Sequence, residues 1–373
     1  MRSPLWAFPI VWLSCGVAVA SSGAAAYDDI DAAVPVDVHG LADAYGLHNF
    51  DDPASGTNQL RAFDFDSGVA LNYLRLTLAR RPGRVGFRVD GGFGNTAEIF
   101  YLQDPAAAAH PHVARAYSYL GQAFFTAIVP LERPITVDVG KFGTPVGLED
   151  NESLGNWNYS RSLLYTWAEP SLHTGLRLSS AVADALDVEL YWVNGWDSGV
   201  LDGSDMRTFA AALNWRPTGS LSIALVDMVG LEHPPTQLTE PLSLRNVVDA
   251  SVVFKAAEVL SLASSADYGN DRADGGVTFW GVAAYARVQA LPWLAAALRG
   301  EYFSDASGFA TGTAQHLAEG TATVEARQDI KRLRLVGRVE YRHDRSSAHP
   351  FDAALPASRS AQDTITFAAL VAF

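Results

Sequence analysis

Cysteine is almost absent from this chain, since Cys15 is the only one among 373 residues. It lies in the apolar segment Leu5–Ala20, which follows a short basic start and precedes the small residues Ala24–Ala26. This order is typical of a secretory signal peptide, and we predict one over residues 1–26. Cleavage after Ala26 leaves a mature chain, residues 27–373, with neither thiol nor disulfide.

Two alternatives concern the same segment. The small residues Ala18–Ala20 offer an earlier cleavage site. A lipoprotein signal would place lipid on Cys15, but Trp12 stands where such a signal has leucine, and the apolar run continues past the cysteine. We favour cleavage after Ala26 because polar residues follow it directly.

Long apolar runs and charged residues are also scarce. After residue 26 no run reaches the roughly 18 apolar residues of a transmembrane helix. Hydrophobic residues nevertheless make up 49% of the chain and charged residues only 18%, which is little charge for a soluble protein. Alternation of apolar and polar residues produces this composition, with every second side chain facing lipid. The net charge of -14 argues against nucleic acid as a partner, because nucleic-acid binding needs basic surfaces.

Alternation over segments of about ten residues is the dominant pattern of the chain. Turn-forming residues separate these segments, so the pattern predicts an all-β fold of about 16 antiparallel strands. The predicted strands are 36–47, 69–80, 85–93, 117–129, 135–142, 173–181, 187–196, 207–216, 220–229, 246–256, 259–268, 278–290, 293–304, 319–329, 333–343 and 363–373.

Segment 333–343 shows the alternation most clearly. Its odd positions are mostly apolar, and its even positions include Arg334, Arg338, Glu340 and Arg342. Because successive side chains of a strand point to opposite faces, the apolar face is predicted to meet lipid. The four charged side chains are then predicted to face a water-filled lumen. In a soluble β-sandwich, the alternative fold, the apolar face would meet a second sheet instead.

The connections between the predicted strands alternate between long and short. Residues 48–68, 94–116 and 144–172 form long loops, whereas 81–84 and 130–134 form short turns. Long loops on one side, short turns on the other and an even strand number are typical of bacterial outer-membrane barrels. We therefore predict one transmembrane β-barrel in the outer membrane of a Gram-negative bacterium, with both termini on the periplasmic side.

The last predicted strand ends on an aromatic residue. Every second residue from Ile365 to Phe373 is apolar and lies on one face. The last strand has to close the sheet. A terminal Phe resembles the signal by which such barrels are recognised for insertion, so Phe373 is predicted to act as the assembly signal, read by the barrel-assembly machinery. The apolar outer face implies contact with outer-membrane lipid and lipopolysaccharide.

Aromatic residues near the predicted strand ends fit the same fold. Trp and Tyr collect at the headgroup level of barrels. These positions are explained equally well by the general preference of aromatic residues for β-strands. The residues concerned are Trp192, Trp196, Trp215, Trp280, Trp293, Tyr191, Tyr285, Tyr302 and Tyr341.

Loop 144–172, the longest, mixes aromatic with charged residues. A loop with so many apolar side chains has to bury one face, and the barrel wall is the available partner. We predict that it folds into the lumen and narrows it. Fixed charges at such a narrowing decide which solutes enter. The candidate constriction residues are Glu149, Asp150, Glu152, Trp157, Tyr159 and Arg161.

Structural roles compete with the functional ones. Arg161 with Glu149 or Glu152 is expected to form an ion pair that pins the loop rather than to contact a solute. His173 is expected to be a hydrogen-bonded interface residue rather than a ligand. Acidic residues outnumber Arg161 in the loop, which predicts a modest preference for cations that weakens at high salt. The arginines of segment 333–343 act against this preference.

Five motifs occur together in the order and spacing of a known family. They are Lys141–Glu149 (KFGTPVGLE), Asn156–Leu164 (NWNYSRSLL), Glu169-Pro170, His173–Arg177 (HTGLR) and Val193–Asp197 (VNGWD). With them the chain resembles the outer-membrane β-barrel porins of the OmpL-like group, most firmly over residues 135–215. The resemblance implies a pore of the sixteen-strand class, with small solutes or ions as substrates. Analogy with porins of this size, which are often trimers, implies a homo-oligomer.

We therefore predict a porin for passive diffusion of small hydrophilic solutes or ions, without cofactor, metal or catalytic step. An outer-membrane hydrolase of lipid or peptide is one alternative, but it needs a convergent Ser and His. Only Ser160, Ser162 and His173 lie near one another, without a compact spacing. The other alternative to a porin is a closed barrel with a structural or adhesive role. Residues 27–35 are too few for a plug domain, which argues against a TonB-dependent transporter.

Overall fold

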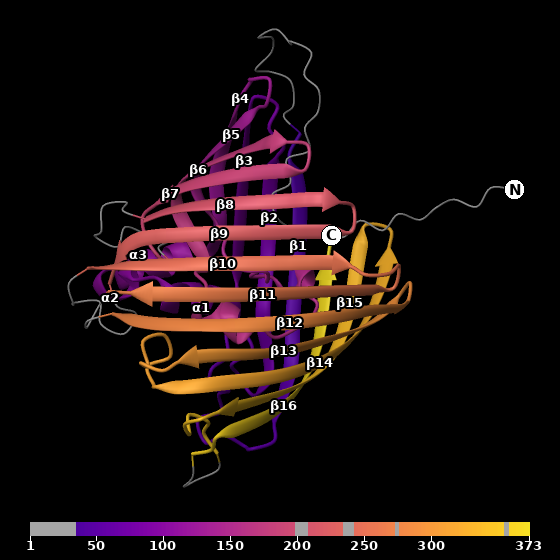
Figure 1. The fold of residues 1–373 in the computed structure, drawn as a ribbon. Helices are drawn as coiled ribbons and strands as arrows, with labels where there is room; N and C mark the ends of the chain where they lie inside the picture. Colours follow the sequence, from indigo (N-terminus) through magenta and orange to yellow (C-terminus); the bar gives the residue numbers. More distant parts are fainter. Residues whose placement is uncertain (1–34, 198–207, 234–241, 273–275, 354–357) are drawn as a thin grey trace, which may run out of the picture.

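The computed structural model describes residues 35–197, 208–233, 242–272, 276–353 and 358–373. Within these ranges, consecutive strands pair antiparallel and β1 also pairs with β16, so the sheet closes into a barrel (Figure 1). The predicted sixteen-strand barrel is confirmed. The predicted signal peptide, residues 1–26, lies outside the described residues. The strands are β1 (Asp37–Asn49), β2 (Gly68–Arg80), β3 (Val85–Phe93), β4 (Leu120–Val129), β5 (Ile135–Gly143), β6 (Leu172–Ala183), β7 (Leu186–Val193), β8 (Thr208–Thr218), β9 (Leu221–Glu232), β10 (Ser243–Lys255), β11 (Leu260–Asp271), β12 (Val277–Leu291), β13 (Leu294–Asp305), β14 (Gln315–Ile330), β15 (Leu333–Ser346) and β16 (Ala361–Ala372).

Helices occupy only the connections. The predicted start of β4 at residue 117 is wrong, because a helix begins at Pro111 and runs on to Ser118. Proline suits the first helical position, where its missing N–H is not needed. None of the described helices is long and apolar enough to span a membrane. The helices are α1 (Asn95–Gln103), α2 (Ala106–Ala109) and α3 (Pro111–Ser118) between β3 and β4, and η1 (Ser153–Gly155) and α4 (Leu163–Trp167) between β5 and β6.

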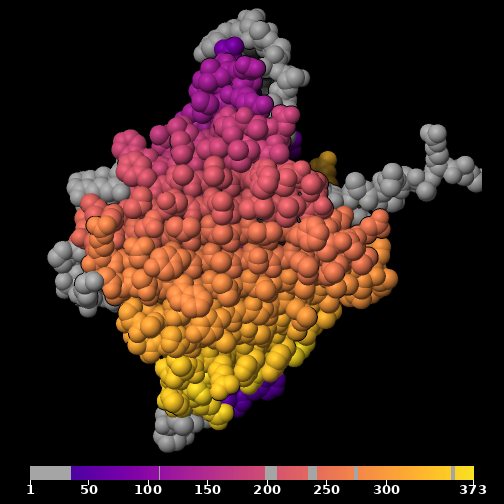
Figure 2. All heavy atoms as spheres, in the orientation of Figure 1, coloured from indigo at the N-terminus to yellow at the C-terminus, as the bar shows by residue number. Residues whose placement is uncertain are grey.

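The two faces of the wall differ as the alternation predicts. On β15 the odd positions, such as Val339 and Tyr341, are exposed on the outside, while Arg338, Glu340 and Arg342 are buried inside. Figure 2 shows one side of this outer wall, on which the strands follow one another in sequence order. The barrel therefore presents an apolar surface outward and encloses most of its charged side chains.

The aromatic residues divide between the two faces. Those exposed on the outside are Trp192, Trp215, Trp280, Trp293, Tyr302 and Tyr341. Tyr191 and Tyr285 are instead buried on the inner face, and Trp196 packs against the same interior cluster. The headgroup position considered for these three is wrong, because the strand phase turns both tyrosines inward and β7 already ends at Val193.

Strands β1 and β16 close the barrel. Their register runs from Leu41 opposite Ala372 to Asn49 opposite Thr364. Beyond it, Gly40 and Phe373 exchange two backbone hydrogen bonds of 3.1 Å. The Phe373 ring lies over Gly40, where an added Cβ would stand 2.2 Å from Phe373 Cε1. A side chain at residue 40 would therefore displace the terminal ring from this position.

The segment between β5 and β6, residues 144–171, lies inside the barrel and is called the inner loop below. Its side chains and backbone hydrogen-bond to inward-facing residues of β1, β2, β13, β14 and β15. Together with β16, these strands form a contiguous part of the closed sheet. The polar side of the inner loop therefore lies along this part of the wall.

Candidate pore constriction

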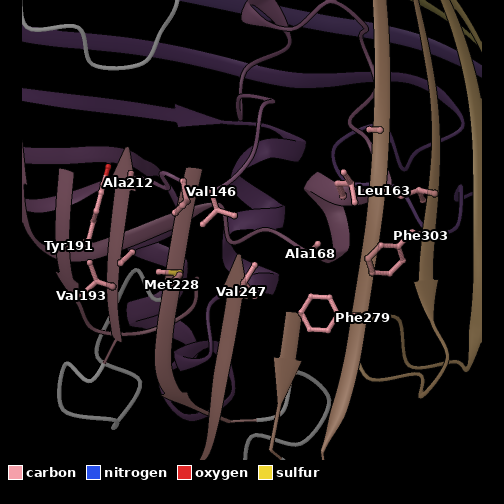
Figure 3. Close-up of a cluster of buried hydrophobic side chains, with 14 of the residues drawn as sticks. Val146, Leu163, Ala168, Tyr191, Val193, Ala212, Met228, Val247, Phe279 and Phe303 are labelled. Atoms are coloured by element: carbon pink, nitrogen blue, oxygen red, sulfur yellow. The ribbon is translucent and has the colours of Figure 1, made fainter. Parts of the chain in front are cut away.

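The apolar side of the inner loop packs against an apolar stripe of the inner wall (Figure 3). The loop contributes Val146, Leu163, Leu164 and Ala168 to this cluster. Facing residues of the wall are Tyr191, Val193, Ala212, Met228, Val247, Phe279 and Phe303. Burial of each large apolar side chain is worth about 1.5–3 kcal/mol. Apolar packing therefore holds this side of the loop.

Arg299 on β13 is the main charged anchor of the inner loop. Its side chain is 0% exposed and pairs with Glu319 on β14 at 2.6 Å and with Glu149 of the loop at 2.8 Å. The same guanidinium donates to the carbonyl oxygens of Ser160 at 2.7 Å and of Arg161 at 3.2 Å. One buried arginine thus joins two wall strands to two parts of the loop.

The inward face of β15 holds the neighbouring part of the loop. Arg338 donates to the carbonyl oxygens of Ser153 at 2.6 Å and Asn156 at 2.8 Å. Glu340 accepts from the backbone N–H of Ser160 at 2.9 Å and also from that of Tyr159. The charged side chains that were predicted to face open water here satisfy the backbone of the loop instead.

Arg334, predicted to face the lumen with them, lies on the same face of β15. It stands at the start of β15, is partly exposed, and pairs with Asp329 at 2.9 Å. A pair that exposed contributes little to stability. Arg342 is fully buried and donates to the Arg161 carbonyl, so it joins the anchors of the loop.

Two of the candidate constriction residues are turned away from open water. Tyr159 is buried and donates its hydroxyl to Asp43 on β1 at 2.9 Å. Arg161 is buried over the ring of Phe63 and donates to the carbonyl oxygens of Asp150 at 3.0 Å and of Tyr159 at 2.7 Å. The expected ion pair of Arg161 with Glu149 or Glu152 is wrong, because backbone carbonyls satisfy this guanidinium and other arginines take the two glutamates.

Glu152 and Trp157 lie on the more open side of the loop. Both are partly exposed, as is Asp150. Glu152 pairs with Arg75 on β2 at 2.6 Å, and Trp157 meets the ring of Tyr285 edge-on, with the ring centroids 6.4 Å apart.

Burial raises the pKa of Glu152 to about 7. Arg75 acts in the opposite direction, and the neighbouring acids Asp150 and Asp90 raise the pKa further. The carboxyl group of Glu152 therefore changes charge near neutral pH, at the edge of the lumen.

Two wall arginines opposite these acids are not among the residues predicted from the sequence to line the pore. Arg75 on β2 and Arg88 on β3 both point inward, and Arg88, whose side chain is 23% exposed, bonds Asp90 at 2.9 Å. The alternation in predicted strands 69–80 and 85–93 does indicate that Arg75 and Arg88 point inward, because each lies on the face opposite to the apolar residues. Acids on the loop and arginines on the wall thus face one another.

The residues considered for catalysis or metal binding have structural partners. His173 is fully buried and bonds the Gly195 carbonyl and the Thr144 hydroxyl, both at 3.1 Å, as its expected structural role requires. Ser162 caps α4 by accepting from the N–H of Tyr165 at 3.0 Å. Within the described ranges, no group of three or more His, Cys, Asp or Glu is arranged to hold a metal ion.

Comparisons with known proteins agree with this architecture. The family model described as "Putative beta-barrel porin-2, OmpL-like" matches residues 35–373. Comparison with curated proteins gives no match.

Solved porins share the fold at low sequence identity. The anion-selective porin from Comamonas acidovorans has a TM-score of 0.59 and 11% identity, with 91% of this chain and 99% of that chain covered. The outer membrane channel DcaP of Acinetobacter baumannii has a TM-score of 0.60 and 12% identity, with coverage of 91% and 97%. OmpT of Vibrio cholerae has a TM-score of 0.53 and 8% identity, with coverage of 91% and 97%. With the family model matched over the whole barrel, the chain belongs to the OmpL-like family of outer-membrane β-barrel porins.

Proposed function

We propose that small hydrophilic solutes and ions cross this porin by passive diffusion, along a path between the inner loop and the wall formed by β2–β4. One observation carries this proposal. Inward-facing polar residues of that wall, such as Arg75, Arg88 and Gln122, are partly exposed. Those of β13 and β15, such as Arg299 and Glu340, are buried under the loop. Water therefore reaches one side of the lumen more than the other.

Family and fold point to a channel rather than an enzyme. The purified protein in planar bilayers is expected to give stepwise conductance that is stable in time. Absence of conductance from correctly folded protein would favour the closed structural or adhesive barrel. Hydrolysis of lipid or peptide that is lost in Ser160→Ala or Ser162→Ala would favour the hydrolase.

We propose that Glu152 sets a modest, pH-dependent preference for cations. Its carboxylate borders the path, and its pKa of about 7 means that the negative charge is present above neutral pH and lost below it. One unit charge acts on an ion roughly 8 Å away in water with about 0.5 kcal/mol, or about twofold in permeability. The ratio of cation to anion permeability is therefore expected to fall about twofold between weakly alkaline and weakly acidic solution.

Reversal potentials in a salt gradient measure this ratio. Glu152→Gln should show the low ratio at both pH values, because it carries no charge at either. Glu149→Gln is unsuitable for this purpose, since it would also remove a partner of the anchor Arg299. A wild type whose ratio does not change with pH, or a Glu152→Gln variant that keeps the change, would show that another group sets the preference.

A further inference from the structure

Three acidic side chains meet where the end of the inner loop touches β10 and β11. Glu169 comes from the loop, Asp249 from β10 and Asp267 from β11, and they are 4%, 1% and 3% exposed. Both carboxyl oxygens of Asp267, Oδ1 of Asp249 and Oε2 of Glu169 are buried without a hydrogen-bond donor. This junction differs from the contacts of the loop with β13 and β15, where arginines balance the acids.

The carboxyl group of Asp267 is in close contact with those of the other two acids. That of Asp267 lies within hydrogen-bonding reach of both Asp249 and Glu169. Asp249 also accepts from the Ser265 hydroxyl at 3.1 Å and from the backbone N–H of Gly147. The main chain approaches so closely here that a Cβ on Gly147 would stand 1.8 Å from Glu169 Oε2. Two carboxyl oxygens can share a hydrogen bond only when a proton lies between them.

The other titratable groups that face this cluster do not balance its charge. Glu149 of the loop and Glu301 of β13 act on Glu169 as further acids, and Tyr285 of β12 is a neutral neighbour. Arg299 is the basic residue beside Glu149 and Glu301, and it is already held by Glu149 and Glu319. Three buried carboxylates without a cation would cost several kcal/mol each, so they take up protons instead.

We propose that Glu169, Asp249 and Asp267 form a proton-binding latch, which holds the end of the inner loop against β10 and β11 while protonated and releases it when deprotonated. This inference rests on the proposed function only for its effect on permeation, since release of the loop end would widen the path. Protonation of the latch is independent of that function.

The sign of the pH dependence follows from burial. Burial is the largest cause that raises the pKa of Glu169 well above its usual range, and the charges of Asp267 and Asp249 raise it further. A raised carboxyl pKa stabilises the docked loop at low pH, and this stabilisation is lost as the pH rises through the folded-state value. The arginine anchors on β13 and β15 keep their charge throughout. Only the end of the loop near Glu169 is therefore expected to detach in alkaline solution.

Infrared spectroscopy tests the protonation directly, through the carbonyl stretch of protonated carboxylic acids in the purified barrel at neutral pH. Comparison of wild type with Asp249→Asn/Asp267→Asn should show loss of part of this band, and Glu169→Gln should remove a part of it independently. Asp138→Asn is the matched control, because Asp138 is also buried on the inner wall but pairs with Arg177 at 2.7 Å. The control should leave the band unchanged.

Conductance gives the second readout. Wild type should pass from a lower to a higher or noisier conductance as the pH rises, whereas the double variant should stay in the lower state. A band that neither set of latch variants reduces would overturn the proposal, even if the protein conducts. So would a double variant that keeps the alkaline transition. Loss of the wild-type band on addition of Ca²⁺ alone would show that the cluster binds a metal cation instead.

Discussion

Replacing Arg299 with methionine is expected to raise the single-channel conductance severalfold and to make the open current noisy. Methionine keeps the apolar length of the side chain but leaves Glu149, Glu301 and Glu319 buried without their cation. Removing one partner of a buried charge network costs about 3–5 kcal/mol. Undocking of the loop relieves this cost, because Glu149 then reaches water, and the freed loop no longer narrows the lumen.

Arg334→Met is the matched control for this experiment. Arg334 and Asp329 form an ion pair at 2.9 Å whose side chains are 37% and 51% exposed, and pairs of this kind contribute at most about 1 kcal/mol. Conductance and noise of this variant should equal those of wild type. An Arg299→Met channel with wild-type conductance would show that apolar packing alone holds the loop in place.

Deletion of Phe373 is expected to lower the amount of assembled barrel about tenfold or more. The deletion removes two backbone hydrogen bonds to Gly40 and the ring that covers this glycine. Such bonds contribute about 1 kcal/mol each in water and more in lipid, where no solvent replaces them. We also propose that Phe373 is the residue by which the assembly machinery recognises the chain. The heat-modifiable form in outer-membrane fractions measures assembly.

Phe367→Ala separates the effect of the seam from a general loss of apolar surface. Phe367 lies on the outward face of β16, which ends one residue before Phe373, and its replacement leaves every backbone hydrogen bond of β16 in place. Assembly of this variant should be reduced only slightly. Equal losses from both changes would mean that outward apolar area, rather than the closing contact, limits assembly.

The barrel was predictable because strand alternation is a local property of the sequence. A period of two residues is visible within any ten, and it sets both the strand and the face of each residue. The outward positions of Val339 and Tyr341 and the inward positions of Arg338 and Glu340 follow from it directly. Strand ends were less certain, because helix α3 overrides the pattern at residues 117 and 118.

The contacts of the inner loop were not predictable in the same way. Glu149 meets Arg299, 150 residues later in the chain, and Ser160 meets Glu340, 180 residues later. No local pattern states which inward residue the loop will reach, so the sequence suggests acids of the same loop as partners of Arg161. The partners of Arg161 in the structure are mainly backbone carbonyl oxygens. Since every residue has a carbonyl oxygen, the sequence cannot indicate which ones this arginine will bind.

The acidic latch escaped prediction for the same reason. Glu169, Asp249 and Asp267 come from three separate elements, and nothing in the sequence around each of them points to the other two. Only closure of the barrel brings the three together, and only their burial makes their charge costly.

The position of the anchors along the chain has a consequence for biogenesis. The inner loop lies in the first half of the chain, whereas its partners Arg299, Glu301, Arg338 and Glu340 belong to the last four strands. Until those strands have paired, the loop has its contacts with β1 and β2 and with the apolar stripe of β7–β12, but it lacks the anchors on β13 and β15. Firm docking of the loop and closure of the wall therefore belong to the same late step of assembly. A barrel whose last four strands have not yet paired would be open at its side and would hold its loop less firmly, which makes it a target for periplasmic quality control.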